Sequence, residues 1–291
     1  MALGFLPSDA CVLVLQAAVV LAPRSPPKLP WLGRLESRAW ALIPIGSIVG
    51  VIFAIRYMSA TATGLTWLAL IAVPLLAAGA LGWACRGGRW WAAALAAVLF
   101  ALAWGSRGTL IGEGAAALLS ALSCVTLGVL LGAVTPPSWM KAGVVAMSAA
   151  DVWLVASDLL QAPNNSLVAA APLPGSHLPQ LQSVLFGTVS LGYGDLFVAG
   201  LLGAVLARQA RRQAPMALLT LLLASAFDVL FLVLGELPAT VPVALALLIG
   251  EAWAWRGRRS AGRSGDEVTP AVAAEATRWL IPRPRVPDES G

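Results

Sequence analysis

Nine apolar runs follow one another along this chain, and each is long enough to cross the roughly 30 Å hydrocarbon core of a bilayer. They lie near residues 3–22, 39–56, 63–84, 89–105, 109–134, 142–161, 183–206, 215–234 and 237–255. A backbone in lipid has to satisfy its own hydrogen bonds, so such runs predict helices. The sequence therefore predicts an all-α, polytopic membrane protein with a nine-helix transmembrane domain over 1–256.

The composition agrees with this class and argues against others. Hydrophobic residues make up 59% of the 291 residues and charged residues only 11%, which is far more apolar than a soluble domain requires. The net charge of +5 comes from basic residues scattered between the apolar runs, a pattern typical of cytoplasmic loops and not of nucleic-acid binding. Three isolated cysteines and one histidine lack the spacing of a metal site, so we expect no metal and no cofactor.

The basic residues also predict an orientation. They concentrate in the first, third, fifth and seventh connections and in the C-terminal tail, whereas the sixth and eighth connections carry none. Positive-inside reasoning then places the N-terminus outside and the C-terminus in the cytoplasm. Residues 257–291 are polar and rich in Arg, Pro and Gly, so we expect a largely disordered cytoplasmic tail.

Two aspartates interrupt the sixth and seventh runs, Asp151 and Asp195. A carboxylate near the bilayer centre costs roughly 2.5–3.5 kcal/mol on insertion scales, so each is a functional-site hypothesis. If both runs are single helices joined by an outer loop, the two residues lie roughly 15 and 18 Å below the outer surface at 1.5 Å per residue. This match in depth predicts that Asp151 and Asp195 meet, whereas Asp158 lies nearer the surface.

Small and helix-breaking residues accompany the two aspartates. Gly192-Tyr193-Gly194 directly precedes Asp195, and its glycines predict a thin, locally loosened stretch of helix. The last run opens with Pro238-Ala239-Thr240 and a second proline at 242, which prevents regular helical hydrogen bonding there. Non-helical backbone at membrane depth is tolerated only beside protein or a water-filled cavity, so we expect this end to line the same site.

Together these features resemble the GxGD intramembrane aspartyl proteases, the presenilin and signal peptide peptidase family. Ala150-Asp151 looks like the sixth-helix Tyr-Asp motif of that family, Gly192-Tyr193-Gly194-Asp195 like its Gly-x-Gly-Asp, and Pro238-Ala239-Thr240 like its ninth-helix Pro-Ala-Leu. The resemblance covers the last four runs, 142–256, while the first five runs, 1–134, match only in number. The chain departs from the family pattern in having Ala150 for tyrosine, Ala199 for proline and Thr240 for leucine.

The resemblance implies a presenilin-like fold and a hydrolase that works without a cofactor. It implies that Asp151 and Asp195 form a catalytic dyad of an aspartic endopeptidase. It also implies that the dyad is supported by Gly192, Tyr193, Gly194, Pro238, Ala239 and Thr240. The implied substrates are single-pass transmembrane segments or signal-peptide remnants, cleaved within the lipid bilayer.

The residues alone leave other functions open. The segment from Thr188 to Asp195 is similar to a potassium-channel filter, although Ser190-Leu191 interrupts the row of carbonyls. A prepilin-type peptidase also uses Gly-x-Gly-Asp, but its usual basic residue after the aspartate is absent here. An ion-coupled transporter would use Asp228 and Glu113 as further intramembrane carboxylates. A structural pairing of the two dyad aspartates, holding helices together, is a last alternative.

Overall fold

The computed structural model describes residues 5–25, 37–42, 46, 50, 59–157, 178–234 and 238–265. Within these residues the chain is mostly helical and contains one two-stranded sheet. In chain order the elements are α1 (Phe5–Leu21), η2 (Arg38–Ala41), α4 (Ser59–Gly79), η3 (Ala80–Ala84), η4 (Trp90–Ala93), α5 (Ala94–Gly105), α6 (Leu110–Val134), α7 (Pro137–Ala156), β1 (Ser183–Phe186), β2 (Val189–Gly192), α9 (Tyr193–Ala207), α10 (Ala210–Leu234) and α11 (Val241–Gly265). The chain divides into two compact units, residues 1–247 and 248–291.

Several of these helices are suited to a membrane. In the described part of the chain, four are long and apolar enough to cross one, namely Thr63–Ala84, Leu110–Val134, Pro137–Ala156 and Ala210–Leu230. Three further apolar helices are shorter, namely Pro7–Leu21, Trp90–Gly105 and Tyr193–Ala207. The predicted helical class is confirmed, whereas only these four of the nine predicted spans have full spanning length among the described residues. Most of the second predicted run, 39–56, lies outside the described residues.

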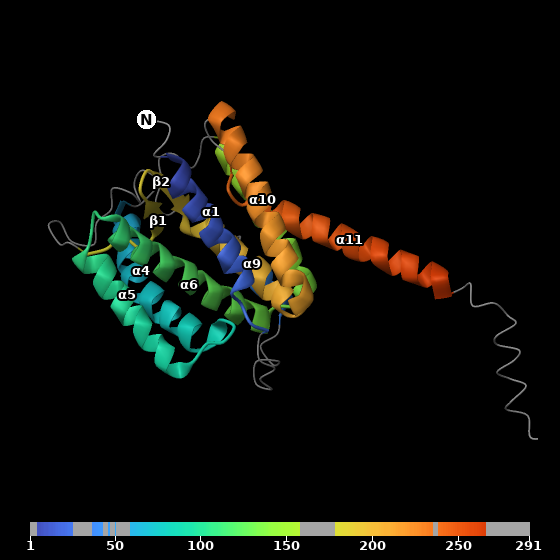
Figure 1. Cartoon of the computed structure of the whole chain (residues 1–291), viewed down its shortest axis with the longest axis horizontal. Helices are drawn as coiled ribbons and strands as arrows, with labels where there is room; N and C mark the ends of the chain where they lie inside the picture. Colours follow the sequence, from blue (N-terminus) through green and yellow to red (C-terminus); the bar gives the residue numbers. More distant parts are fainter. Residues whose placement is uncertain are drawn as a thin grey trace, which may run out of the picture. The chain divides into compact units, whose positions relative to one another are not determined.

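α6 lies at the centre of the first unit. It packs against α4 and α5 and also against α9, and Figure 1 shows it running between them. A Cβ on Gly200 of α9 would lie 2.4 Å from the carbonyl oxygen of Cys124, and one on Gly128 of α6 would lie 2.4 Å from the carbonyl oxygen of Gly200. Only glycine at both positions lets the two backbones approach this closely. The seam between α6 and α9 is thus set by two glycines.

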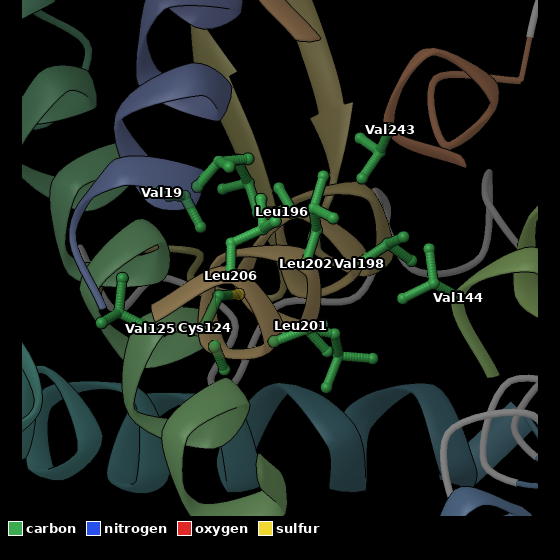
Figure 2. Packing of buried hydrophobic residues seen from close by; sticks show 14 of the residues in the cluster. Val19, Cys124, Val125, Val144, Leu196, Val198, Leu201, Leu202, Leu206 and Val243 are labelled. Atoms are coloured by element: carbon green, nitrogen blue, oxygen red, sulfur yellow. The ribbon is translucent and has the colours of Figure 1, made fainter. Parts of the chain in front are cut away.

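α9 is the core helix of this unit, because every residue from Val198 to Ala207 is buried. A helix that is apolar on all its faces belongs inside protein rather than at a surface. Figure 2 shows its side chains reaching α1, α6, α7 and the first turn of α11. The labelled residues are Val19, Cys124, Val125, Val144, Leu196, Val198, Leu201, Leu202, Leu206 and Val243.

The prediction of one continuous helix over 183–206 is wrong. β1 and β2 pair as an antiparallel hairpin, from Ser183 opposite Gly192 to Phe186 opposite Val189. Gly187 supplies the positive φ of 62° that its two-residue turn requires. Helix begins only at Tyr193. A short apolar run does not by itself distinguish a strand from a helix, and here α6 contacts β1 while α1 contacts β2, so the hairpin backbone lies beside protein.

The helices around the hairpin also differ from their predicted bounds. α7 begins at Pro137, a residue suited to the first turn of a helix, and it ends at Ala156 rather than near 161. α11 begins at Val241 after a turn in which the Val241 N–H donates to the Pro238 carbonyl. It continues to Gly265, so the start of the segment predicted to be disordered is helical. Residues 266–291 lie outside the described residues.

Candidate functional site

Asp195 lies where the hairpin becomes helix, as the third residue of α9. Its Oδ2 accepts a hydrogen bond from the N–H of Gly192, the N-cap residue, at 3.0 Å. This is one half of a capping box, since glycine has no side chain to return the second bond. The carboxylate is therefore held at the positive end of the α9 dipole, and not midway along a helix as the sequence predicts.

α7 carries Asp151 on its inward face. Met140, Val144, Met147 and Leu154 recur at helical spacing and are all buried. Asp151 falls in the same stripe, between Met147 and Leu154, and is half-buried. The helix that packs its apolar face against α9 thus brings a carboxylate with it.

Thr240, the residue before α11, binds Asp151 through two groups. Its hydroxyl donates to Asp151 Oδ2 at 2.6 Å, and its backbone N–H donates to the same carboxylate. Ser148, one turn earlier on α7, donates to the Thr240 carbonyl at 3.0 Å. Gln16 of α1 donates to the Ala239 carbonyl at 3.2 Å. The non-helical segment 238–240, predicted to support the site, is therefore fixed directly against the helix of Asp151.

The two aspartates are close enough for their charges to interact. The sequence predicts their meeting from equal depths along two spanning helices. The structure instead places Asp195 in the first turn of α9 and Asp151 near the end of α7.

Gly192 and Gly194 have roles different from those predicted. A Cβ on Gly192 would lie 2.9 Å from Asp195 Oδ2, whereas a Cβ on Gly194 would meet no atom within 4 Å. Gly192 therefore makes room for the carboxylate itself, and Gly194 borders open space. The close approach of two helices that the sequence assigns to this pair is made by Gly128 and Gly200 instead.

Tyr193 and the segment that leads into the hairpin are held by α6. The Tyr193 hydroxyl hydrogen-bonds with Ser123 Oγ at 2.7 Å, and Cys124 Sγ donates to the Tyr193 carbonyl at 3.8 Å. Ser120 Oγ donates to the Leu181 carbonyl at 3.3 Å. Sequence reasoning did not select these α6 residues. Their one signal was the presence of small polar side chains inside an apolar run.

The other acidic residues considered from sequence have partners of their own. Glu113 Oε2 accepts a hydrogen bond from the Gly187 N–H at 2.7 Å, so it holds the hairpin turn. Asp228 on α10 hydrogen-bonds with Asp9 on α1, a residue that sequence reasoning did not select. Asp9 is buried, and its Oδ2 has no hydrogen-bond partner among the described residues. Asp158 lies outside the described residues.

The segment that is similar to a channel filter does not have a filter's conformation. Residues 189–192 form β2, and helix begins at Tyr193. Helical residues turn their carbonyls into intrahelical hydrogen bonds, so Tyr193 and Gly194 cannot contribute to an exposed row of carbonyl oxygens of the kind that replaces an ion's hydration shell.

Comparisons of the chain with protein-family models, with curated proteins and with solved structures find no match. A functional assignment therefore rests on the site. Its main features are the interaction of Asp151 with Asp195 and the hydrogen bonds from Thr240 to Asp151.

Proposed function

We propose that this protein is an intramembrane aspartic endopeptidase of the presenilin and signal peptide peptidase type, with Asp151 and Asp195 as its catalytic pair. Two features carry the proposal: the charge interaction between carboxylates on two different apolar helices, and the hydrogen bond that joins Asp151 to the segment 238–240. A purely structural contact would pair a carboxylate with a base or a neutral donor, because two buried charges of like sign repel. Two interacting carboxylates instead suit a shared proton.

In the proposed mechanism the pair holds one proton. Thr240 donates two hydrogen bonds to Asp151, so we assign the ionised role to Asp151 and the proton to Asp195. Asp151 takes a proton from water as the water oxygen attacks the peptide carbonyl carbon, while Asp195 gives its proton to the carbonyl oxygen. The gem-diol then collapses: Asp151 protonates the amide nitrogen, the C–N bond breaks, and a gem-diol hydroxyl returns its proton to Asp195.

The hairpin beside the dyad suits an extended substrate. A helix hides its carbonyls in its own hydrogen bonds, so a transmembrane substrate has to unwind at the scissile bond. Extended backbone binds by pairing with a strand edge, and β2 ends at Gly192, directly before the turn of helix that carries Asp195. Open space around Gly194 adds room next to the carboxylate. We therefore propose unwound single-pass segments or signal-peptide remnants as substrates.

The proposal extends to the whole membrane domain. It includes nine membrane helices, with the second over 39–56, and an N-terminus outside with the C-terminus in the cytoplasm. The 15 residues of α9 span only about 22 Å at 1.5 Å per residue, less than a bilayer core. The burial of α9 among other helices supports its place among the membrane helices despite its short length. The hairpin that precedes it is non-helical, and non-helical backbone is tolerated at membrane depth when protein surrounds it.

Substitution of each aspartate by asparagine tests the proposal. Wild-type protein in liposomes should cleave a single-pass substrate whose transmembrane helix contains a helix-destabilising Gly pair. Asp151→Asn and Asp195→Asn should each abolish cleavage, because asparagine keeps the shape of the side chain but cannot cycle a proton. The cleavage products, identified by mass, report the activity, and thermal unfolding in detergent reports whether the variants still fold.

Asp228→Asn is the matched control, because it changes a carboxyl group on α10 that is bonded to Asp9 and not to the dyad. We expect this variant to keep its activity. Cleavage at near wild-type rate by either dyad variant would refute the peptidase.

Proton-coupled transport is the second candidate, and the Asp9–Asp228 pair is the observation that favours it. Intramembrane carboxylates that can exchange protons line the pathways of many transporters. Proteoliposomes with an imposed pH gradient separate the two functions. Transport would be favoured over proteolysis if the wild type carries a proton flux but cleaves no substrate, and if Asp228→Asn loses that flux.

A further inference from the structure

Ser183 is the cross-strand neighbour of Gly192, the residue that binds Asp195. The hairpin register places Ser183 directly opposite Gly192. Side chains of such opposed residues lie on the same face of the sheet, with Cβ atoms about 4.5–5.5 Å apart. The side chain of Ser183 and the vacant side-chain position of Gly192 therefore share one face of the hairpin.

The Asp195 carboxylate occupies that same face. A Cβ built on Gly192 would lie 2.9 Å from Asp195 Oδ2 and 3.7 Å from the carboxyl carbon. The space that a side chain at position 192 would fill is thus taken by the carboxylate. It follows that the hydroxyl of Ser183 projects beside Asp195.

The Ser183 hydroxyl has no hydrogen-bond partner among the residues that the structure describes, and its Oγ is buried. A buried hydroxyl without a hydrogen bond costs free energy, whereas each neighbouring carboxylate already accepts a bond, Asp195 from Gly192 and Asp151 from Thr240. An unused donor and acceptor beside the Asp195 carboxylate suits a ligand that hydrogen-bonds with both groups.

We infer that Ser183 is a third catalytic residue, which holds the attacking water between itself and the dyad. This inference rests on the proposed peptidase function. The water donates one hydrogen to Asp151 and the other to Ser183 Oγ, which directs a lone pair of its oxygen at the substrate carbonyl. Two polar protein partners fall within the range of about two to four hydrogen bonds that an ordered internal water makes. Ser183 keeps its own proton throughout, so the proton balance of the mechanism is unchanged.

Ser183→Ala tests the role in turnover. It should lower kcat for the single-pass substrate roughly tenfold, the loss expected for about one hydrogen bond, with KM changed less than about twofold because substrate backbone binding does not use this hydroxyl. Ser190→Ala is the matched control, since Ser190 lies on the same face of the hairpin but is exposed and farther from the dyad. We expect Ser190→Ala to match the wild type.

Inhibitor binding provides a readout that a structural role would not move. A peptide isostere with a hydroxyl on a tetrahedral carbon in place of the scissile carbonyl puts that hydroxyl where the water attacks. Ser183→Ala should weaken its binding roughly tenfold, the same loss of one hydrogen bond, while the des-hydroxy analogue binds as tightly as to wild type. If Ser183→Ala fails to fold, Ser183→Thr and Ser183→Val, which are equal in shape, replace it, and only the threonine variant should retain activity.

The outcomes separate this inference from the proposed function. In one outcome both aspartate variants lose cleavage, while Ser183→Ala keeps its kcat and its affinity for the isostere. That outcome would support the peptidase and overturn the role of Ser183. Equal weakening of both inhibitors would also overturn it, because it would indicate a general change in the site. A wild-type protein that neither cleaves substrate nor binds the isostere would overturn both.

Discussion

A missing Cβ decides where the Asp195 carboxylate lies. Gly192 caps α9 with an extended backbone at φ −65°, a conformation open to any residue, so glycine is not required there for its backbone freedom. It is required because the carboxylate fills the space of its side chain. The Gly-x-Gly-Asp pattern thus has two inequivalent glycines, one against the carboxylate and one against open space.

Gly192→Ala and Gly194→Ala test this difference at the residue scale. We expect Gly192→Ala to reduce kcat roughly 100-fold, because a displacement of about 1 Å at a catalytic group has an effect of that size. Gly194→Ala should retain near wild-type activity, since its new Cβ meets no atom within 4 Å. Cleavage of the single-pass substrate measures both variants. Equal effects of the two changes would contradict the placement of Asp195 against Gly192.

At the scale of elements, α6 holds the site in place without contributing a dyad residue. It binds the hairpin turn through Glu113, Leu181 just ahead of the hairpin through Ser120, and Tyr193 through Ser123. The same helix contacts α9 along the seam of Gly128 and Gly200. A shift of α6 against α9 would therefore move the hairpin and Asp195 together.

Gly200→Ala tests this seam. The added methyl group would meet the backbone carbonyl of Cys124 at 2.4 Å, and overpacking of this kind costs about 1–3 kcal/mol of stability. We expect a lower unfolding temperature in detergent and a parallel loss of cleavage. Gly64→Ala on α4 is the control, because nothing lies within 4 Å of its Cβ and alanine favours helix over glycine. A Gly200→Ala protein as stable as wild type would refute the close seam.

At the scale of the whole molecule, basic connections that are far apart in the sequence come together. Arg24 and Arg86 each donate a backbone hydrogen bond across the pairing of Pro23 with Cys85, so the first and third connections lie side by side. The Arg86 guanidinium donates to Gln213 of α10, next to the seventh connection. Positive-inside reasoning assigns all three connections to one side of the membrane, and their contact in the first unit supports that assignment.

Accessibility measurements test the orientation. A reporter fused after Gly291 should lie in the cytoplasm, and a tag inserted within 164–177 should be accessible from outside, because the first and seventh connections are basic and the sixth and eighth are not. Protease protection in sealed cells and membrane vesicles reads out both positions. The reverse accessibility would invert the domain and change which single-pass substrates could enter the site.

The sequence by itself determined the helical class and selected Asp151, Asp195 and the segment 238–240 as one candidate site. These features are local, because a long apolar run requires helix in lipid and a carboxylate within such a run is too costly to be incidental. Tertiary structure alone decided that residues 183–192 form a hairpin and that Thr240 binds Asp151. Whether a short apolar run forms a strand or a helix depends on the elements beside it. Thr240 and Asp151 are 89 residues apart in the chain, so they can form a hydrogen bond only after the helices pack.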